Sequence, residues 1–97
     1  MYLVVSRWEP LPGKEAEFER VGKTLGAMLR SQPGVVMVEA IRGNGHHIAV
    51  AGYEDEATYR RLVDSPDSPF MKAASEQRME EVARWLGSDR GETLPYG

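Results

Sequence analysis

Two adjacent histidines, His46 and His47, are the residues best suited to moving a proton. Histidine is the side chain that most readily changes charge near neutral pH. Both follow the turn segment 43–45 on an expected strand, so their side chains point to opposite faces and are poorly placed to bind one metal ion. His47 is therefore a candidate catalytic base. A solvated hairpin end is the plainer interpretation, and it is favoured because the turn lies so close.

Glu39 is the second candidate base. In the expected strand pairing it shares a face with four apolar residues, Met37, Ile41, Ile48 and Val50. An unpaired carboxylate on such a face would be costly in its charged form. An ion pair with an arginine or lysine from a helix or a partner chain is the favoured alternative, because buried carboxylates are generally paired.

Aromatic and hydroxyl side chains along the expected first strand, Tyr2 to Glu9, could bind a substrate. Alternation places Tyr2, Ser6 and Trp8 on one face, where Trp8 could stack on a flat molecule. Arg42, at the end of a later strand, could hold an anion. The alternatives are core or dimer packing for Tyr2 and Trp8, which is favoured, and a solvated strand end for Arg42.

The elements that must position these residues follow from periodicity and from turn chemistry. Apolar spacing predicts a helix from about Lys14 to Ser31, and Pro33-Gly34 ends it. Two strands, Val35 to Arg42 and His46 to Tyr53, are joined by Gly43-Asn44-Gly45. A two-residue turn at Asn44-Gly45 pairs Arg42 with His47 and Glu39 with Val50, whereas a three-residue turn would shift this pairing.

The second half of the chain is expected to be helical. Asp55 begins a short helix that ends at Asp64, and Ser68 with Pro69 begins another that runs to about Leu86. Gly87 is in the place that a C-terminal glycine takes. Residues 88–97 are expected to be a tail in which Thr93 to Tyr96 forms at most a very short edge strand.

This order of elements predicts an α+β ferredoxin-like split βαβ sandwich with the 48–52 strand in the centre of the sheet. Helices on one face would leave the other face bare. That face would carry one of two apolar sets: Val36, Val38, Ala40, Ala49 and Ala51, or Val35, Met37, Ile41, Ile48 and Val50. A bare apolar face of this size indicates an interface, so we expect a homodimer joined through its sheet faces.

Composition limits the classes of function. The 97 residues make one domain, and the net charge of −3 disfavours a nucleic-acid partner, since phosphate binding needs a basic face. No apolar run is long enough for a bilayer and no signal peptide is recognisable, so a cytoplasmic protein with no membrane partner is expected. The lack of cysteine excludes thiolate chemistry and cysteine-ligated metals, and the histidines and acids suggest no metal site.

Three segments carry a resemblance to a known family: PGVVMVEAIR, IAVAGYEDEATYRRL and SPDSPFMKAA. Together with the first strand and Phe18 they resemble the antibiotic biosynthesis monooxygenase domain of the dimeric α/β-barrel superfamily. The resemblance covers about residues 2–86 of the single domain 1–97, with 87–97 as the tail. Since members usually end in a well-formed fourth strand, the short tail would leave the barrel incompletely closed.

The resemblance implies a function as well as a fold. It places Ser6, and with it Tyr2 and Trp8, on the helix-facing side of the first strand. It implies a cofactor-independent monooxygenase of a small aromatic or phenolic compound, or alternatively a non-catalytic homodimer that binds a small hydrophobic ligand or acts in stress. The haem-degrading branch uses an Asn, a Trp and a His where this chain has Ser6, Leu62 and about Ala74. We therefore expect no haem and no other cofactor.

Overall fold

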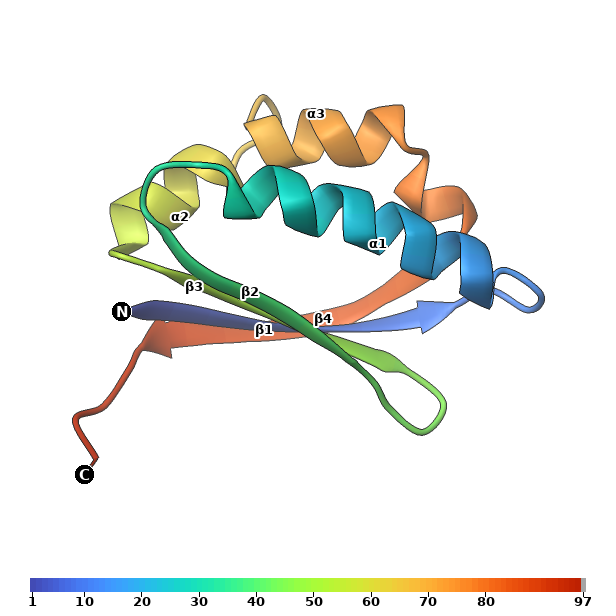
Figure 1. Cartoon of the computed structure of the whole chain (residues 1–97), viewed down its shortest axis with the longest axis horizontal. Helices are drawn as coiled ribbons and strands as arrows, with labels where there is room; N and C mark the ends of the chain where they lie inside the picture. Colours follow the sequence, from blue (N-terminus) through green and yellow to red (C-terminus); the bar gives the residue numbers. More distant parts are fainter. Residues whose placement is uncertain (97) are drawn as a thin grey trace.

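The computed structural model of the chain describes residues 1–96, which form a four-stranded antiparallel sheet with helices on one side (Figure 1). Gly97, the last residue of the predicted domain, lies outside the described residues. The elements are, in order, β1 (Tyr2–Pro10), α1 (Glu15–Arg30), β2 (Val35–Arg42), β3 (His47–Tyr53), α2 (Glu56–Leu62), α3 (Pro69–Glu76), the short 3-10 helix η1 (Met79–Glu81) and β4 (Ala83–Glu92). The strand order is β2-β3-β1-β4, so the α+β ferredoxin-like fold is confirmed.

The β2–β3 hairpin has the predicted register. Arg42 lies opposite His47 and Glu39 lies opposite Val50. The Gly43 N–H donates to the His46 carbonyl at 2.8 Å, which closes the two-residue turn. Because β3 pairs with both β1 and β2, it is a central strand, as its apolar sequence predicted.

The two predicted helix caps are also present. The Asp55 carboxylate accepts a hydrogen bond from the Thr58 N–H at 2.8 Å and begins α2. The Ser68 hydroxyl accepts from the Met71 N–H at 3.2 Å and begins α3, with Pro69 in its first turn. Each cap satisfies a backbone donor that the first turn leaves without a helical partner.

The prediction of a long last helix was wrong. Instead of continuing to Leu86, α3 ends at Glu76, and Arg78 turns the chain with a φ of 55°. Gly87 is no helix cap, because it lies within β4 with a φ of 139°. The predicted apolar stripe is divided accordingly: Met79 and Val82 are buried, whereas Met71 and Leu86 are exposed.

The fourth strand is therefore long. It is β4, Ala83–Glu92, and not the short segment Thr93 to Tyr96. It pairs with β1 along the whole of that strand, from Tyr2 opposite Glu92 to Pro10 opposite Ala83. The pairing with β1 supplies the backbone hydrogen bonds that a terminal tail would have lacked.

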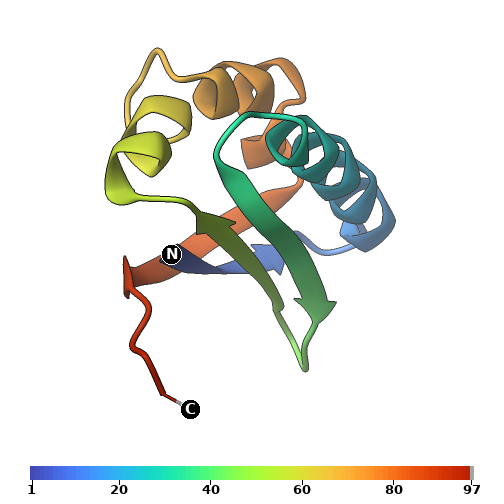
Figure 2. The same cartoon turned by 60° about the vertical axis from the view of Figure 1, so that its left-hand side comes forward.

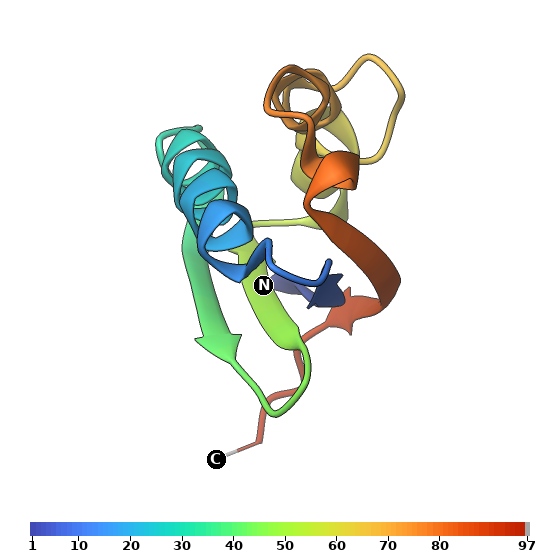
Figure 3. The same ribbon diagram turned by 90° about the vertical axis from the view of Figure 1, so that its right-hand side faces the viewer.

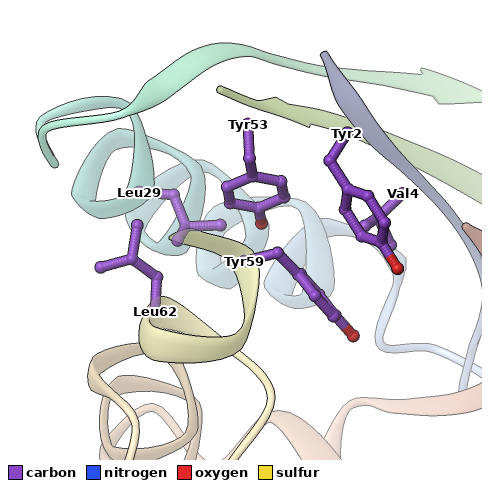
Figure 4. Packing of buried hydrophobic residues seen from close by; sticks show 6 residues of the cluster. All are labelled: Tyr2, Val4, Leu29, Tyr53, Tyr59 and Leu62. Atoms are coloured by element: carbon purple, nitrogen blue, oxygen red, sulfur yellow. The ribbon is translucent and has the colours of Figure 1, made fainter. Parts of the chain in front are cut away.

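All three helices lie on one side of the sheet, as Figures 2 and 3 show. Two clusters fill the space beneath them. The first consists of Tyr2, Val4, Leu29, Tyr53, Tyr59 and Leu62 (Figure 4), and the second of Phe18, Val21, Leu25, Met79, Val82 and Ala83. The core thus contains Tyr2, and the packing role favoured for it is confirmed.

The side of the sheet without helices carries the second of the two predicted apolar sets, with one exception. Because β2 has a bulge after Val35, that residue packs with the core cluster beneath the helices. Alternation and register give the opposite side Leu3, Val5, Met37, Ile41, Ile48 and Val50. We call this side of the sheet the open face.

Candidate functional site

Three aromatic side chains form a row across the helix-facing side of the sheet. Trp8 of β1 lies opposite His47 of β3 and opposite Trp85 of β4. Directly opposite residues of antiparallel strands point to the same face. Trp8 is thus on the predicted side of β1, and it lies between His47 and Trp85 on the helix-facing side of the sheet.

A bulge in β4 gives Trp85 its direction. The register passes from Arg7 opposite Gly87 to Trp8 opposite Trp85, so that Leu86 is the extra residue. Trp85 and Ser88, three positions apart, therefore share a face. Their hydrogen bond agrees with this, since the Trp85 indole Nε1–H donates to the Ser88 Oγ at 3.2 Å.

Next to this row, a pair of hydroxyls joins β1 and β4. The Ser6 Oγ lies 2.8 Å from the Ser88 Oγ. One hydroxyl donates to the other, so one of the two hydrogens is left over and can point away from the pair. Ser6 is thus on the face that was predicted for it, within a polar strip flanked by aromatic rings.

His47 is held by an acid and by an aromatic ring. Its Nε2 lies 2.7 Å from the Oε2 of Glu19, a residue of α1. The Phe18 ring meets it edge to face, with centroids 5.2 Å apart, and the centroids of the Phe18 and Trp8 rings are 6.2 Å apart. The imidazole side chain is only 14% exposed. Its second nitrogen, Nδ1, is buried and has no hydrogen-bond partner among residues 1–96.

Arg42 also donates hydrogen bonds to the Glu19 carboxylate. Its Nε donates to the Glu19 Oε2 at 2.7 Å, and its Nη2 donates to the Oε1 at 2.6 Å. These hydrogen bonds from Arg42, with that from His47, lower the pKa of Glu19 to about 2. Arg42, the predicted anion anchor, thus has an anion of its own chain as its partner.

The other end of the helix-facing side is built from tyrosines. The Tyr59 ring lies 5.4 Å from Tyr2 and 5.5 Å from Tyr53, measured between centroids. In Figure 4 the rings of Tyr2 and Tyr59 extend in the same direction. Burial raises the pKa of Tyr53 to about 12. The guanidinium of Arg90 lies 5.8 Å from the Tyr59 ring centre, which is a cation–π distance.

Glu39 lies apart from these groups. It shares the open face with Met37 and Ile41, as the register predicted, and its side chain is exposed. The sheet separates it from His47 and Trp8. The six predicted site residues therefore fall into two sets. Glu39 lies on the open face, and the helix-facing side carries the other five: Tyr2, Ser6, Trp8, Arg42 and His47.

Sequence reasoning did not single out Glu19, Ser88 or Arg90. The only sequence signal for Glu19 is its place one turn after Glu15 on the expected helix. Ser88 and Arg90 were assigned to a polar tail. A serine and an arginine two apart could have indicated one face of a strand, had a strand been expected.

Among residues 1–96, no three histidine or acidic side chains are arranged to hold a metal ion. The helices of the same region include none that is long and apolar enough to cross a bilayer.

A depression of about 230 Å³ opens beside Arg42 and His47, lined also by Glu15 and His46.

Solved structures reveal what this arrangement is similar to. A variant of SnoaB from Streptomyces nogalater, a cofactor-independent oxygenase, is 26% identical, with a TM-score of 0.72 over 98% of this chain and 97% of that one. A protein named as an antibiotic biosynthesis monooxygenase is 13% identical, with a TM-score of 0.77 over 98% and 100% of the two chains. The chain shares the antibiotic biosynthesis monooxygenase fold.

Other solved structures agree on this fold. PA3566 from Pseudomonas aeruginosa is 16% identical, with a TM-score of 0.78 over 96% of this chain and 93% of that one. Comparison with known families by sequence finds no match, and comparison with curated proteins finds none. The resemblance to antibiotic biosynthesis monooxygenases therefore rests on the fold that these solved structures share with the chain.

Proposed function

We propose that this protein is a cofactor-independent monooxygenase that acts on a small aromatic or phenolic compound. The carrying observation is that three features share the helix-facing side of adjacent strands: the Nδ1 of His47, which has no partner among residues 1–96, the Trp8 ring and the Ser6–Ser88 hydroxyl pair. The likeness to SnoaB supports the same reaction class. Aromatic surface, a base and a hydroxyl donor are what an electron-rich phenol requires.

The proposed reaction inserts one oxygen atom of O₂ into the substrate. A ring methylene group and O₂ give a ring carbonyl and one water molecule, which balances both atoms and electrons. The substrate supplies all of the electrons. The protein has to remove a proton, stabilise the resulting anion and keep water away from it.

Each task has a candidate in the structure. His47 accepts the substrate proton at Nδ1, since its Nε2 is already bonded to Glu19. The free hydrogen of the Ser6–Ser88 pair donates to the anionic oxygen. Arg90 adds positive charge on the same side of β4 as Ser88, and among residues 1–96 it has no carboxylate within 4.0 Å. Trp8 supplies a flat apolar contact.

Oxygen uptake tests this function directly. The purified protein, without added metal or cofactor, is mixed with a panel of hydroxynaphthalenes and anthrones. We expect at least one compound to consume oxygen, and ¹⁸O₂ to leave one labelled atom in the product. For that compound His47→Ala should lower kcat roughly 100-fold or more, the usual contribution of a general base.

His46→Ala is the matched control, because His46 is the neighbouring histidine and lies in the turn just before β3. It should keep wild-type turnover. If both variants turn over the compound at the wild-type rate, His47 is not the base. If no compound in the panel consumes oxygen, the monooxygenase proposal loses its support.

One observation favours the rival function, a non-catalytic protein that binds a small ligand or acts in stress. The Phe18 ring of α1 packs against both Trp8 and His47 and fills part of the space between α1 and the sheet. Such filling is typical of a core. The rival predicts that an aromatic probe quenches tryptophan fluorescence on binding while no oxygen is consumed.

The homodimer joined through the sheet faces belongs to this proposal as well. The open face combines six apolar residues with the exposed carboxylate of Glu39. Covering it would remove apolar surface from water. In that dimer Glu39 needs a cation from the partner chain, and its proposed role as a base gives way to an ion pair. A nucleic-acid partner is not proposed, and the cytoplasmic location stays a prediction.

A further inference from the structure

We propose that Glu19 is a positioning residue for His47: its carboxylate accepts the Nε2–H hydrogen and leaves the buried Nδ1 as the proton-accepting nitrogen. This inference rests on the proposed function, in which His47 is the base. It assigns a role to a residue of α1 that belongs to neither strand of the site. The two residues are 28 positions apart in the chain and are joined by a contact of 2.7 Å.

The tautomer follows from the inventory of donors and acceptors. A carboxylate with a pKa of about 2 is ionised at neutral pH and can only accept hydrogen bonds. The Nε2 atom of His47, 2.7 Å away, must therefore carry a hydrogen. In the neutral ring the other nitrogen, Nδ1, then has a free lone pair.

The burial of Nδ1 also favours the tautomer with its hydrogen on Nε2. A buried N–H without an acceptor is costly, and the Nδ1 atom has no partner among residues 1–96. A free lone pair at this atom is the cheaper state, and a substrate hydroxyl would be its missing donor. Unsatisfied polar atoms inside a protein are often found where a ligand completes the bonding.

The surroundings hold both partners in place. Arg42 donates two hydrogen bonds to Glu19, so the carboxylate cannot rotate away from the ring. Phe18 packs edge to face against the imidazole. The other charged or titratable groups near the ring are Glu15 and His46, which line the neighbouring depression. Neither forms a hydrogen bond with His47 in the described structure.

Nuclear magnetic resonance can read the tautomer without any substrate. In long-range ¹⁵N–¹H spectra of the ligand-free protein at alkaline pH, His47 should be a single Nε2–H tautomer. In Glu19→Ala the ring loses its acceptor, and we expect a mixture of both tautomers. Glu19→Gln should keep the wild-type tautomer, because the amide oxygen can still accept from Nε2–H.

Glu17→Ala is the matched control, since it removes an acid two positions away on the same helix. Within residues 1–96, Glu17 pairs only with Lys14 and Arg20. It should leave the His47 spectrum unchanged. The proposal is overturned if wild-type His47 carries its hydrogen on Nδ1, or if Glu19→Ala leaves the spectrum as it is in the wild type.

Turnover gives the second measurement. On any compound that the oxygen panel identifies, Glu19→Ala should lower kcat by about 10- to 100-fold and change KM by less than about 3-fold, because Glu19 acts through the base. An unchanged kcat in Glu19→Ala would show that Glu19 has no role in turnover. Since the spectra need no substrate, a panel without a hit would count against the monooxygenase and leave the tautomer result standing.

Discussion

At the scale of single residues, the site is organised around a carboxylate with two partners. Glu19 joins Arg42 at the end of β2 to His47 at the start of β3, which are opposite each other in the hairpin. Through Glu19, helix α1 is thereby hydrogen-bonded to the end of the β2–β3 hairpin. An arginine that could have held a substrate anion instead holds the acid that orients the histidine.

The lowered pKa of Glu19 predicts how this cluster responds to acid. A group whose folded pKa lies below its unfolded value stabilises the fold above the unfolded pKa. The stability that Glu19 adds should therefore be complete above pH 4.5 and should be lost as the pH falls to about 2. Thermal unfolding of the wild type and Glu19→Gln, compared between neutral pH and pH 2, tests this.

We expect the difference in Tm between these two proteins to shrink across that window and to vanish at its lower end. Glu17→Gln should show a much smaller difference throughout, because the Glu17 pairs with Lys14 and Arg20 are exposed. A difference in Tm that stays constant from neutral pH to pH 2 would contradict the assignment. High salt should weaken the effect, since the Glu19 side chain is 34% exposed.

At the scale of elements, the connection between α1 and β2 depends on one glycine. Gly34 has a φ of +89°, and a Cβ atom placed on it would lie 2.8 Å from the Cγ2 of Thr58. Thr58 is buried and its hydroxyl donates to Asp55 at 2.7 Å, so it cannot move aside easily. The start of β2 and the cap of α2 are thus packed against each other.

Gly34→Ala should lower the free energy of unfolding by roughly 2–4 kcal/mol, from backbone strain and overpacking together. Gly13→Ala separates the two causes. Gly13 also has a positive φ, +77°, but nothing lies within 4 Å of its added Cβ. It should cost only about 1 kcal/mol. Urea unfolding measures both, and equal losses would show that the Thr58 contact is not tight.

At the scale of the whole molecule, the sheet separates two surfaces with different roles. The helix-facing side carries the aromatic row and the hydroxyl pair. The open face carries apolar side chains, and its Ile41 is 58% exposed. If a second copy covers that face, the helix-facing sites of both copies stay accessible, because they lie on the far sides of the two sheets.

Light scattering tests the dimer. We expect the wild type to have twice the 10.8 kDa mass of one chain at micromolar concentration. Ile41→Glu should give the mass of one chain, because it buries a charge in the proposed interface. Met71→Glu is the control: Met71 is 45% exposed on α3, away from the open face, and its variant should stay dimeric. A wild type with the mass of one chain would refute the dimer.

Local patterns were sufficient for much of the fold. The alternation of Tyr2 to Glu9, the helical spacing beginning at Phe18 and the turn at Asn44-Gly45 predicted β1, α1 and the hairpin register, which the structure has. Alternation also placed Tyr2, Ser6 and Trp8 on a shared face. These features depend on neighbours only a few residues away, so their signals are complete within the sequence.

The sequence by itself therefore determined β1, α1, the hairpin and the grouping of Tyr2, Ser6 and Trp8. Only the tertiary structure decided β4 and the partner of His47. Residues 83–92 contain two glycines and no β-branched residue, so their strand forms because β1 offers an unpaired edge along its whole length. Glu19 meets His47 because α1 packs across the sheet, a long-range contact that no local periodicity encodes.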